Sequence, residues 1–130
     1  MNFSNVTNMS YLFYSSPALT SVNFGNIDTS QVTDMSSAFT ACSNLVDLDL
    51  SKFTTASVTK FNDMFNNCPI LNTLDIRNFT FDSNPSYAGM FSNIRNQCTI
   101  IVKSDTEKQW ILDKFPSLTG VKTVAEYEAQ

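Results

Sequence analysis

A unit of 26 residues recurs along this chain without a gap, and it constrains the fold more than any other feature of the sequence. The aligned blocks start at Val6, Val32 and Val58, and the second and third share 10 identities in their 26 positions. Apolar residues recur in register at two further sites: Phe13, Phe39 and Phe65, and Leu19, Leu45 and Leu71. Such a period is typical of repeat proteins, in which each unit packs against its neighbours.

The chain of 130 residues is long enough for one hydrophobic core, and we assign all of it to one domain. Three full repeats span residues 6–31, 32–57 and 58–83. A partial fourth repeat spans residues 84–103, where Phe91, Ile100 and Val102 still fall on the apolar positions of the unit. Residues 104–130 leave the pattern, so we predict that they form a C-terminal cap.

Each unit contains two different spacings of apolar residues. Met35, Phe39 and Cys42 lie at i, i+4 and i+7, which predicts one face of a short helix, with a cap at Thr33 or Asp34. The segment 48–50 alternates apolar and polar residues, as a half-buried strand does. Stacked units therefore predict an α/β solenoid with a short parallel β-ladder on one face and short helices on the other.

The cap has the sequence signals of a helix. Ser104 and Glu107 have the spacing of a capping box, and the helix should run to about Lys114, with Pro116 beyond its end. Three apolar residues would then cover the last coil: Trp110, Ile111 and Phe115. Residues 121–124 are predicted to add a short final strand.

The phrases VTDMSSAFTACSNLVDLDLSKF and VTKFNDMFNNCPILNTLDIRNF resemble the BspA-type leucine-rich repeats of bacterial surface proteins, and TIIVKSDTEKQWILDKFPSL resembles the ending of such arrays. The resemblance runs from about Val6 to about Leu118. It implies a leucine-rich-repeat-like right-handed coil in a secreted or surface-attached protein that adheres to host proteins or other cells. Similar repeats also occur in phage proteins and in surface proteins of some protozoa.

The resemblance implies an extracellular or cell-surface location, but the chain departs from the surface-protein pattern. Its first residues lack the basic and apolar segments of a signal peptide, and no apolar run approaches the roughly 18 residues of a membrane span. We therefore expect no membrane insertion. A fragment of a longer surface protein and a phage-encoded protein both remain open.

The composition argues against an enzyme. The chain has no histidine, so the commonest general base and neutral metal ligand are missing, and it has no phosphate-binding glycine motif. We expect no catalytic residues, cofactor, resident metal or small-molecule substrate. A net charge of −4 also argues against nucleic-acid binding, which needs a basic patch.

The three cysteines do not have the number or spacing of a disulfide framework. Cys42 and Cys68 are one repeat apart, so a bridge between stacked coils is conceivable, but we favour small apolar residues buried in the core. Cys98 has no base nearby in the sequence, and we expect it to be a structural thiol.

The outward side chains of the strands form the candidate functional surface. Asn23, Asp49, Asp75 and Ile101 are predicted to form one column, and neighbouring strands would place Asp49 close to Asp75. The predicted binding face comprises Ser21, Asn23, Asp47, Asp49, Ser51, Thr73, Asp75 and Arg77. A weak calcium site at Asp47, Asp49 and Asp75 is less favoured than a solvated acidic strip, because calcium takes six to eight oxygen ligands.

These features favour a non-catalytic binding or adhesion module of a bacterial surface-type protein, which recognises a protein or glycan through its strand face. The alternative is a structural or receptor-contacting component of a phage or other particle. For the acidic column we expect Asp49→Ala to leave stability unchanged or to raise it slightly, because facing carboxylates repel.

Overall fold

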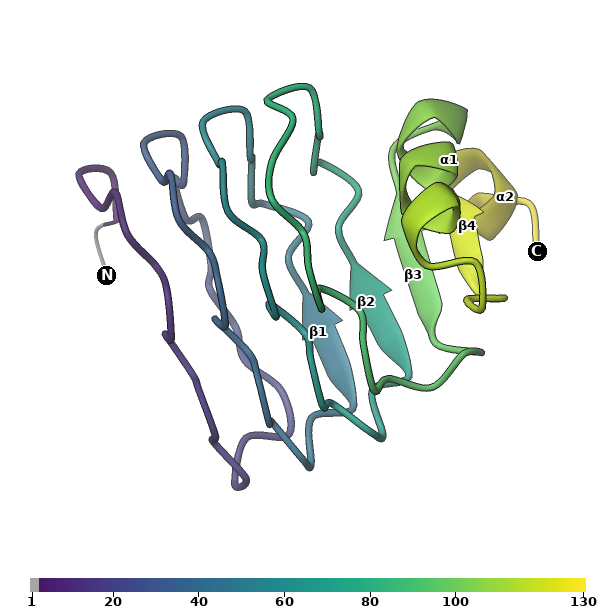
Figure 1. Cartoon of the computed structure of the whole chain (residues 1–130), viewed down its shortest axis with the longest axis horizontal. Helices are drawn as coiled ribbons and strands as arrows, with labels where there is room; N and C mark the ends of the chain where they lie inside the picture. Colours follow the sequence, from purple (N-terminus) through teal and green to yellow (C-terminus); the bar gives the residue numbers. More distant parts are fainter. Residues whose placement is uncertain (1–2) are drawn as a thin grey trace.

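The computed structural model describes residues 3–130, which form an α/β fold built on one parallel sheet (Figure 1). Its four strands follow one another in the order of the chain: β1 (Asp47–Asp49), β2 (Thr73–Asp75), β3 (Thr99–Val102) and β4 (Val121–Thr123). Leu48 pairs with Leu74, and Leu74 pairs with Ile100. The sequence repeat therefore sets the register of β1, β2 and β3, because partners lie 26 residues apart.

The prediction of short helices opposite the strands is wrong. The segments 35–42 and 61–68 are chains of turns, in which Ala38 N–H donates to the carbonyl of Met35 (3.3 Å) and Phe39 N–H donates to the carbonyl of Met64 in the next unit (2.9 Å). Ser37 and Ala41 have positive φ angles of 56° and 60°. An α-helix needs negative φ throughout and N–H bonds to residue i−4, and neither condition holds here.

The positive φ angles recur at two positions in every unit. One set comprises Tyr11, Ser37, Asp63 and Gly89, and the other comprises Ser15, Ala41, Asn67 and Asn93. Between these residues, alternate N–H groups bond to the carbonyls of the next unit, so neighbouring units are joined by hydrogen bonds on this side as well as through the sheet. The backbone polar groups are thus satisfied between units instead of within a helix.

The core lies between these turns and the sheet, and the sequence predicts its members correctly. Met35, Phe39 and Cys42 are all fully buried, as are Leu48 and Leu50. The rings of four equivalent phenylalanines stack one on the next: Phe13, Phe39, Phe65 and Phe91. Centroid separations of 5.6 to 6.0 Å lie in the range of favourable aromatic pairs.

The strand predicted for the first unit is not formed. Residues 20–24 carry no strand, and among the backbone hydrogen bonds of residues 3–130 only that from Val46 N–H to the carbonyl of Thr20 (3.1 Å) links this stretch to the residue just before β1. Asn23 accepts a hydrogen bond from Gly25 N–H (2.8 Å), and Gly25 has a φ of 61°. The same contact is made by Asp49 and Asp75 at the ends of β1 and β2, so it does not by itself account for the missing strand.

The C-terminal segment contains the predicted helix and the predicted last strand. The helix α1 spans Asp105–Lys114, and β4 follows it. The capping box predicted at its start is not made in full: Ser104 Oγ donates to Glu107 Oε1 (2.5 Å), and its side chain makes no bond to the helix backbone. Because two side chains bond to each other here, the helix N–H groups of the first turn gain no side-chain acceptor from Ser104.

The prediction that three apolar residues of this segment cover the fourth unit is confirmed. Ile111 is fully buried, and Trp110 stacks flat on Phe81 with centroids 3.9 Å apart and an interplanar angle of 3°. Phe115 meets Phe91 edge to face at 5.3 Å. These aromatic contacts join the C-terminal segment to Phe81 of the third repeat and Phe91 of the fourth.

A second helix, α2 (Val124–Glu128), ends the chain and was not predicted from the sequence. It begins with a complete capping box, in which Thr123 Oγ1 accepts from Glu126 N–H (3.1 Å) and Glu126 Oε1 accepts from Thr123 N–H (2.9 Å). Lys108 of α1 adds an ion pair to Glu126 (2.9 Å). The helix packs against β3 and β4, so it lies at that end of the sheet.

Candidate binding face

The outward side chains of β1 and β2 form two columns on the sheet. Asp49 is the register partner of Asp75, and Asp47 is the partner of Thr73, so the predicted proximity of Asp49 and Asp75 is confirmed. Asp47 and Asp49 are exposed, and Thr73 and Asp75 are half-buried. This surface, with Ser21, Asn23, Ser51 and Arg77, is called the strand face below.

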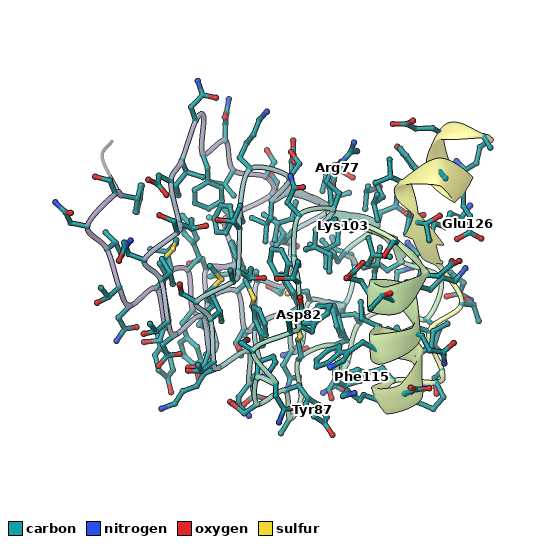
Figure 2. All side chains as sticks on the ribbon, turned by 90° about the horizontal axis from the view of Figure 1, so that it is seen from above. Arg77, Asp82, Tyr87, Lys103, Phe115 and Glu126 are labelled. Atoms are coloured by element: carbon teal, nitrogen blue, oxygen red, sulfur yellow. The ribbon has the colours of Figure 1, made fainter. Side chains whose placement is uncertain are left out.

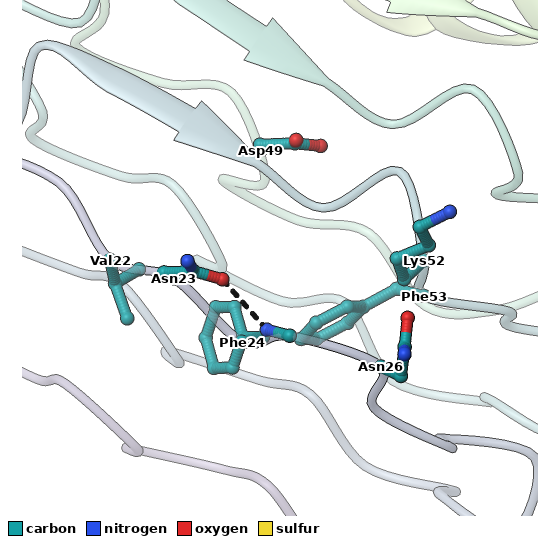
Figure 3. Close-up of a pocket in the computed structure, with 8 residues that line it drawn as sticks. Val22, Asn23, Phe24, Asn26, Asp49, Lys52 and Phe53 are labelled. Carbon is teal, nitrogen blue, oxygen red and sulfur yellow. Dashed lines mark hydrogen bonds between the residues drawn. The ribbon is translucent and has the colours of Figure 1, made fainter.

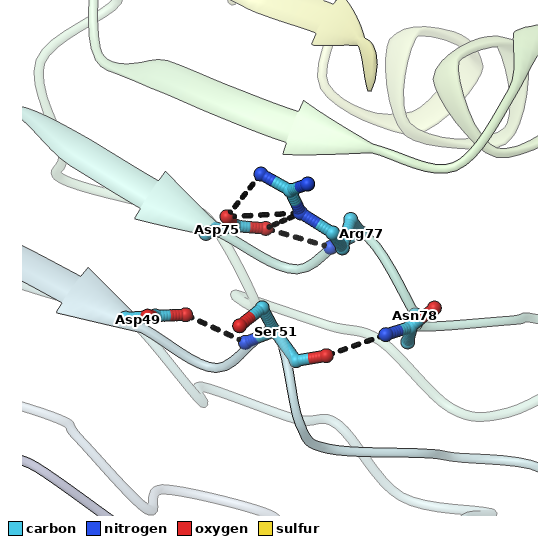
Figure 4. Close-up of polar contacts among 5 residues, drawn as sticks. All are labelled: Asp49, Ser51, Asp75, Arg77 and Asn78. Carbon is cyan, nitrogen blue, oxygen red and sulfur yellow. Dashed lines mark hydrogen bonds and ion pairs between the residues drawn. The ribbon is translucent and has the colours of Figure 1, made fainter.

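The charge of Asp75 is compensated on the strand face itself. Arg77 binds its carboxylate with two nitrogens, Nη2 to Oδ2 at 2.8 Å and Nε to Oδ1 at 3.0 Å (Figure 4). The backbone N–H of Arg77 also donates to Asp75 Oδ1 (3.1 Å). A two-point contact of this kind fixes the guanidinium in place. Its positive charge reduces the repulsion between the facing carboxylates of Asp49 and Asp75.

Each polar residue of the central column is held by a hydrogen bond within its own turn. Asp49 Oδ1 accepts from Ser51 N–H (2.9 Å), as Asn23 accepts from Gly25 and Asp75 from Arg77. The pKa of Asp49 is lowered, first by hydrogen bonding from Ser51 and further by the charges of Arg77 and Lys52. These side chains are therefore ionised or polar, oriented, and open to solvent on one side.

Two hollows lie along the strand face. The first, of about 460 Å³, lies between the first two units and is lined by Asn23, Phe24 and Asn26 on one side and Asp49 and Lys52 on the other (Figure 3). Its polar groups come from two neighbouring units. It can hold a group that spans neighbouring units, such as a side chain or a sugar ring.

The second hollow, of about 240 Å³, lies over β1 and β2 and ends at α2. Its rim contains Asp47, Asp49 and Arg77, and Tyr127 of α2 contributes an aromatic wall. No sequence pattern indicates Tyr127, because its place on the strand face depends on how α2 packs. Ile101, expected to be exposed at the end of the column, is 2% exposed, because α2 packs against β3.

The strand face holds neither a cluster of metal-ligating side chains nor a thiol in the described chain. Among residues 3–130, no three His, Cys, Asp or Glu side chains are arranged so that they could hold a metal ion. Asp75 is engaged by Arg77, and no thiol lies on this face, since Cys42, Cys68 and Cys98 are free and buried. Burial raises the pKa of the Cys98 thiol to about 12, which disfavours the nucleophilic thiolate.

A family model described as "Mycoplasma protein of unknown function, DUF285" matches residues 1–104, which is most of the chain. The chain belongs to this family. The DUF285 match ends at Ser104, so α1, β4 and α2 lie outside it. No curated protein and no solved structure matches the chain. In the part of the chain that the structure describes, neither helix is long and apolar enough to cross a membrane.

Proposed function

We propose that the chain is a leucine-rich-repeat-like solenoid of the BspA type, coiled with a right hand, which serves as a non-catalytic binding module. The register of the sheet supports the proposed solenoid, since residues paired between β1, β2 and β3 lie 26 residues apart in the chain. The turns opposite the sheet repeat at the same interval. A unit of this size cannot bury both of its apolar faces alone, and stacking supplies the missing cover.

The strand face is the proposed binding surface, and the observation that carries this is the orientation of its polar side chains. Asp49 and Asp75 are each fixed by a hydrogen bond two residues along, and Arg77 is fixed by its two-point contact with Asp75. Side chains that are already ordered lose little conformational entropy when a ligand binds. A surface of this kind supports recognition without requiring any group to react.

The proposed ligand is a protein or a glycan that bridges several units. Hollows of about 460 and 240 Å³ lie side by side along the strand face and share Asp49. Their rims offer carboxylate, amide and hydroxyl oxygens together with Lys52 and Arg77, which suits partners rich in hydrogen-bond donors and acceptors. An extracellular or cell-surface role in adhesion follows from the resemblance to BspA-type repeats.

The test is a binding screen of the purified full chain against immobilised extracellular-matrix proteins and an array of glycans. Any ligand found is then measured with Asp47→Lys and Asp49→Lys, which place a long cation in the hollow over β1 and β2. We expect each change to weaken binding at least tenfold. Asp113→Lys is the matched control, because it reverses an exposed carboxylate on α1, an element absent from the lining of both hollows.

A ligand whose affinity is the same for wild type, Asp47→Lys and Asp49→Lys would contradict the proposal that the strand face binds it. Turnover of any substrate by the purified chain would contradict the non-catalytic role. Both outcomes can be interpreted because these carboxylates are exposed, and each substitution should leave the fold intact.

A further inference from the structure

The hollow over β1 and β2 combines an aromatic wall with hydrogen-bond acceptors and donors. Its volume is about 240 Å³, and Tyr127 of α2 lines it beside residues of the strand face. Tyr127 is half-buried, and its ring contacts no other aromatic ring among residues 3–130. The C-terminal segment therefore adds an aromatic ring to a surface that is otherwise built from the repeats.

The acceptors of this hollow are carboxylate oxygens at its rim. Asp47 is exposed, and its carboxylate makes no hydrogen bond or ion pair in the described chain. Asp49 Oδ1 accepts from Ser51 N–H (2.9 Å), which orients that carboxylate. The two residues lie two positions apart on β1, so both side chains project from the same face of the sheet, roughly 7 Å apart along the strand.

The donors of this hollow come from Arg77. Two of its nitrogens bind Asp75, Nη2 at 2.8 Å and Nε at 3.0 Å, so the guanidinium is held in one orientation (Figure 4). Its third nitrogen, Nη1, makes no hydrogen bond within residues 3–130. A guanidinium carries five N–H donors, so the two on Nη1 remain available to a ligand.

A ligand that fits this rim needs donors, acceptors and an apolar face. A simple cation is attracted by the carboxylates but is repelled by Arg77, and an anion meets three carboxylates. Each hydroxyl of a hexopyranose both donates and accepts, and the C–H bonds on one side of its ring suit the negative face of an aromatic ring. The hollow is smaller than the roughly 300–1,000 Å³ of pockets for drug-sized ligands, which suits a single ring.

We propose that this hollow binds one hexopyranose ring of an uncharged glycan, an inference that rests on the proposed function of the strand face. The C–H side of the sugar packs on Tyr127, its hydroxyls donate to Asp47 and Asp49, and one hydroxyl accepts from Arg77 Nη1. Because three carboxylates face one guanidinium, the rim is net negative. It therefore disfavours acidic sugars such as sialic acid.

The test is a titration of the full-length protein with the methyl pyranosides of glucose, galactose and mannose, followed by amide NMR. We expect at least one of them to bind saturably and to shift the amide signals of residues 47–49 and 127. Tyr127→Ala should weaken this binding at least tenfold, whereas Tyr127→Phe, which keeps the ring, should bind as wild type does. Tyr14→Ala is the matched control, because Tyr14 is an exposed ring (51%) that lines neither hollow of the strand face.

A displaced α2 would also weaken binding, so its position is checked in Tyr127→Ala. The carboxyl signal of Glu126 reports on its contact with Lys108 of α1 (2.9 Å), and we expect it to stay unchanged. Asp47→Ala removes an acceptor on β1 without altering α2, and it should also weaken pyranoside binding at least tenfold.

Three results would each overturn this sugar site: no binding of any of the three pyranosides, an affinity that Asp47→Ala leaves unchanged, or equal affinity for the methyl glycoside of sialic acid. The proposed function is tested separately. A ligand from the binding screen that Asp49→Lys weakens would keep the strand face as the binding surface even if the pyranosides fail to bind.

Discussion

The rings of Phe39 and Phe65 stack with their planes 12° apart and their centroids 6.0 Å apart, although 26 residues separate them in the chain. Phe13 extends this column at one end and Phe91 at the other. Each ring therefore packs against rings from the units before and after it, and Phe39 and Phe65 are fully buried. A column of this kind makes the stability of one unit depend on its neighbours.

Phe39→Ala tests the column at its centre. Removal of a buried ring leaves a cavity, and we expect the free energy of unfolding to fall by about 3–5 kcal/mol. Chemical denaturation monitored by circular dichroism gives this value. Ile70→Ala is the control, because Ile70 is exposed and its truncation should change stability by only about 0.5 kcal/mol. A loss below about 1 kcal/mol for Phe39→Ala would mean that the ring is not in the core.

The sequence correctly predicts which residues opposite the sheet are buried. It does not predict the backbone conformation of the segment that carries them. Met35, Phe39 and Cys42 have helical spacing, and they face the core, yet their segment is a chain of turns. The two conformations differ in where the N–H groups bond, which a pattern of apolar residues does not encode. Asp63 and Asn67 lie at the positive-φ positions. Because Asp and Asn are enriched among residues with positive φ, these two residues could have indicated turns in place of a helix.

The strand face was predicted in part for a similar reason. Alternation placed Asp47, Asp49 and Asp75 outward correctly, because period two is a direct consequence of strand geometry. The burial of Ile101 and the position of Tyr127 depend on α2, whose five residues include none that is buried. A short helix without a buried apolar residue leaves no periodic signal in the sequence.

Gly120→Ala tests the junction between the fourth unit and β4. A Cβ at Gly120 would lie 2.1 Å from the carbonyl oxygen of Cys98, which is backbone just before β3, and the Gly120 carbonyl accepts a hydrogen bond from Ile100 N–H of β3 (3.0 Å). We expect the substitution to lower the free energy of unfolding by about 1–3 kcal/mol, or more if the strand cannot shift.

Gly25→Ala is the matched comparison for Gly120→Ala. At Gly25 a Cβ meets nothing within 4 Å, so only the positive φ of 61° opposes it, at a cost of about 1 kcal/mol. Urea denaturation of both variants gives the two values. A larger loss at Gly25 than at Gly120 would contradict the close approach of Gly120 to Cys98.

Asp49 is predicted to affect stability more through its hydrogen bond with Ser51 than through its charge. The sequence alone suggests that Asp49→Ala is neutral or stabilising, but Asp49 accepts a hydrogen bond from Ser51 N–H. We expect Asp49→Ala to lower stability by about 1 kcal/mol, and Asp49→Asn, which keeps the acceptor, to change it by less than about 0.5 kcal/mol. Equal losses for Ala and Asn would indicate that the charge matters instead.

The three thiols are predicted to be unreactive in the native protein. Cys42 Sγ donates to the carbonyl of Phe13 (3.2 Å), Cys68 Sγ donates to that of Phe39 (3.1 Å), and neither thiol is exposed. The hydrogen bond to Cys42 and burial both raise the pKa of Cys68. We expect an aromatic disulfide reagent to modify no thiol at pH 8 and all three in denaturant. Rapid modification of any of the three thiols in the native protein would contradict their burial.

Glu126 links the two C-terminal helices, and its titration reports whether they are docked. Hydrogen bonding from Thr123 N–H and the contact with Lys108 lower its pKa to about 2. Because the folded pKa is below the unfolded value of about 4.3, the stabilisation is complete above that pH and is lost as pH falls toward 2. Carbon-detected NMR of the side-chain carboxyl should show this midpoint. Lys108→Met should raise it, whereas a wild-type midpoint near 4.3 would mean that α1 and α2 are not held together by this contact.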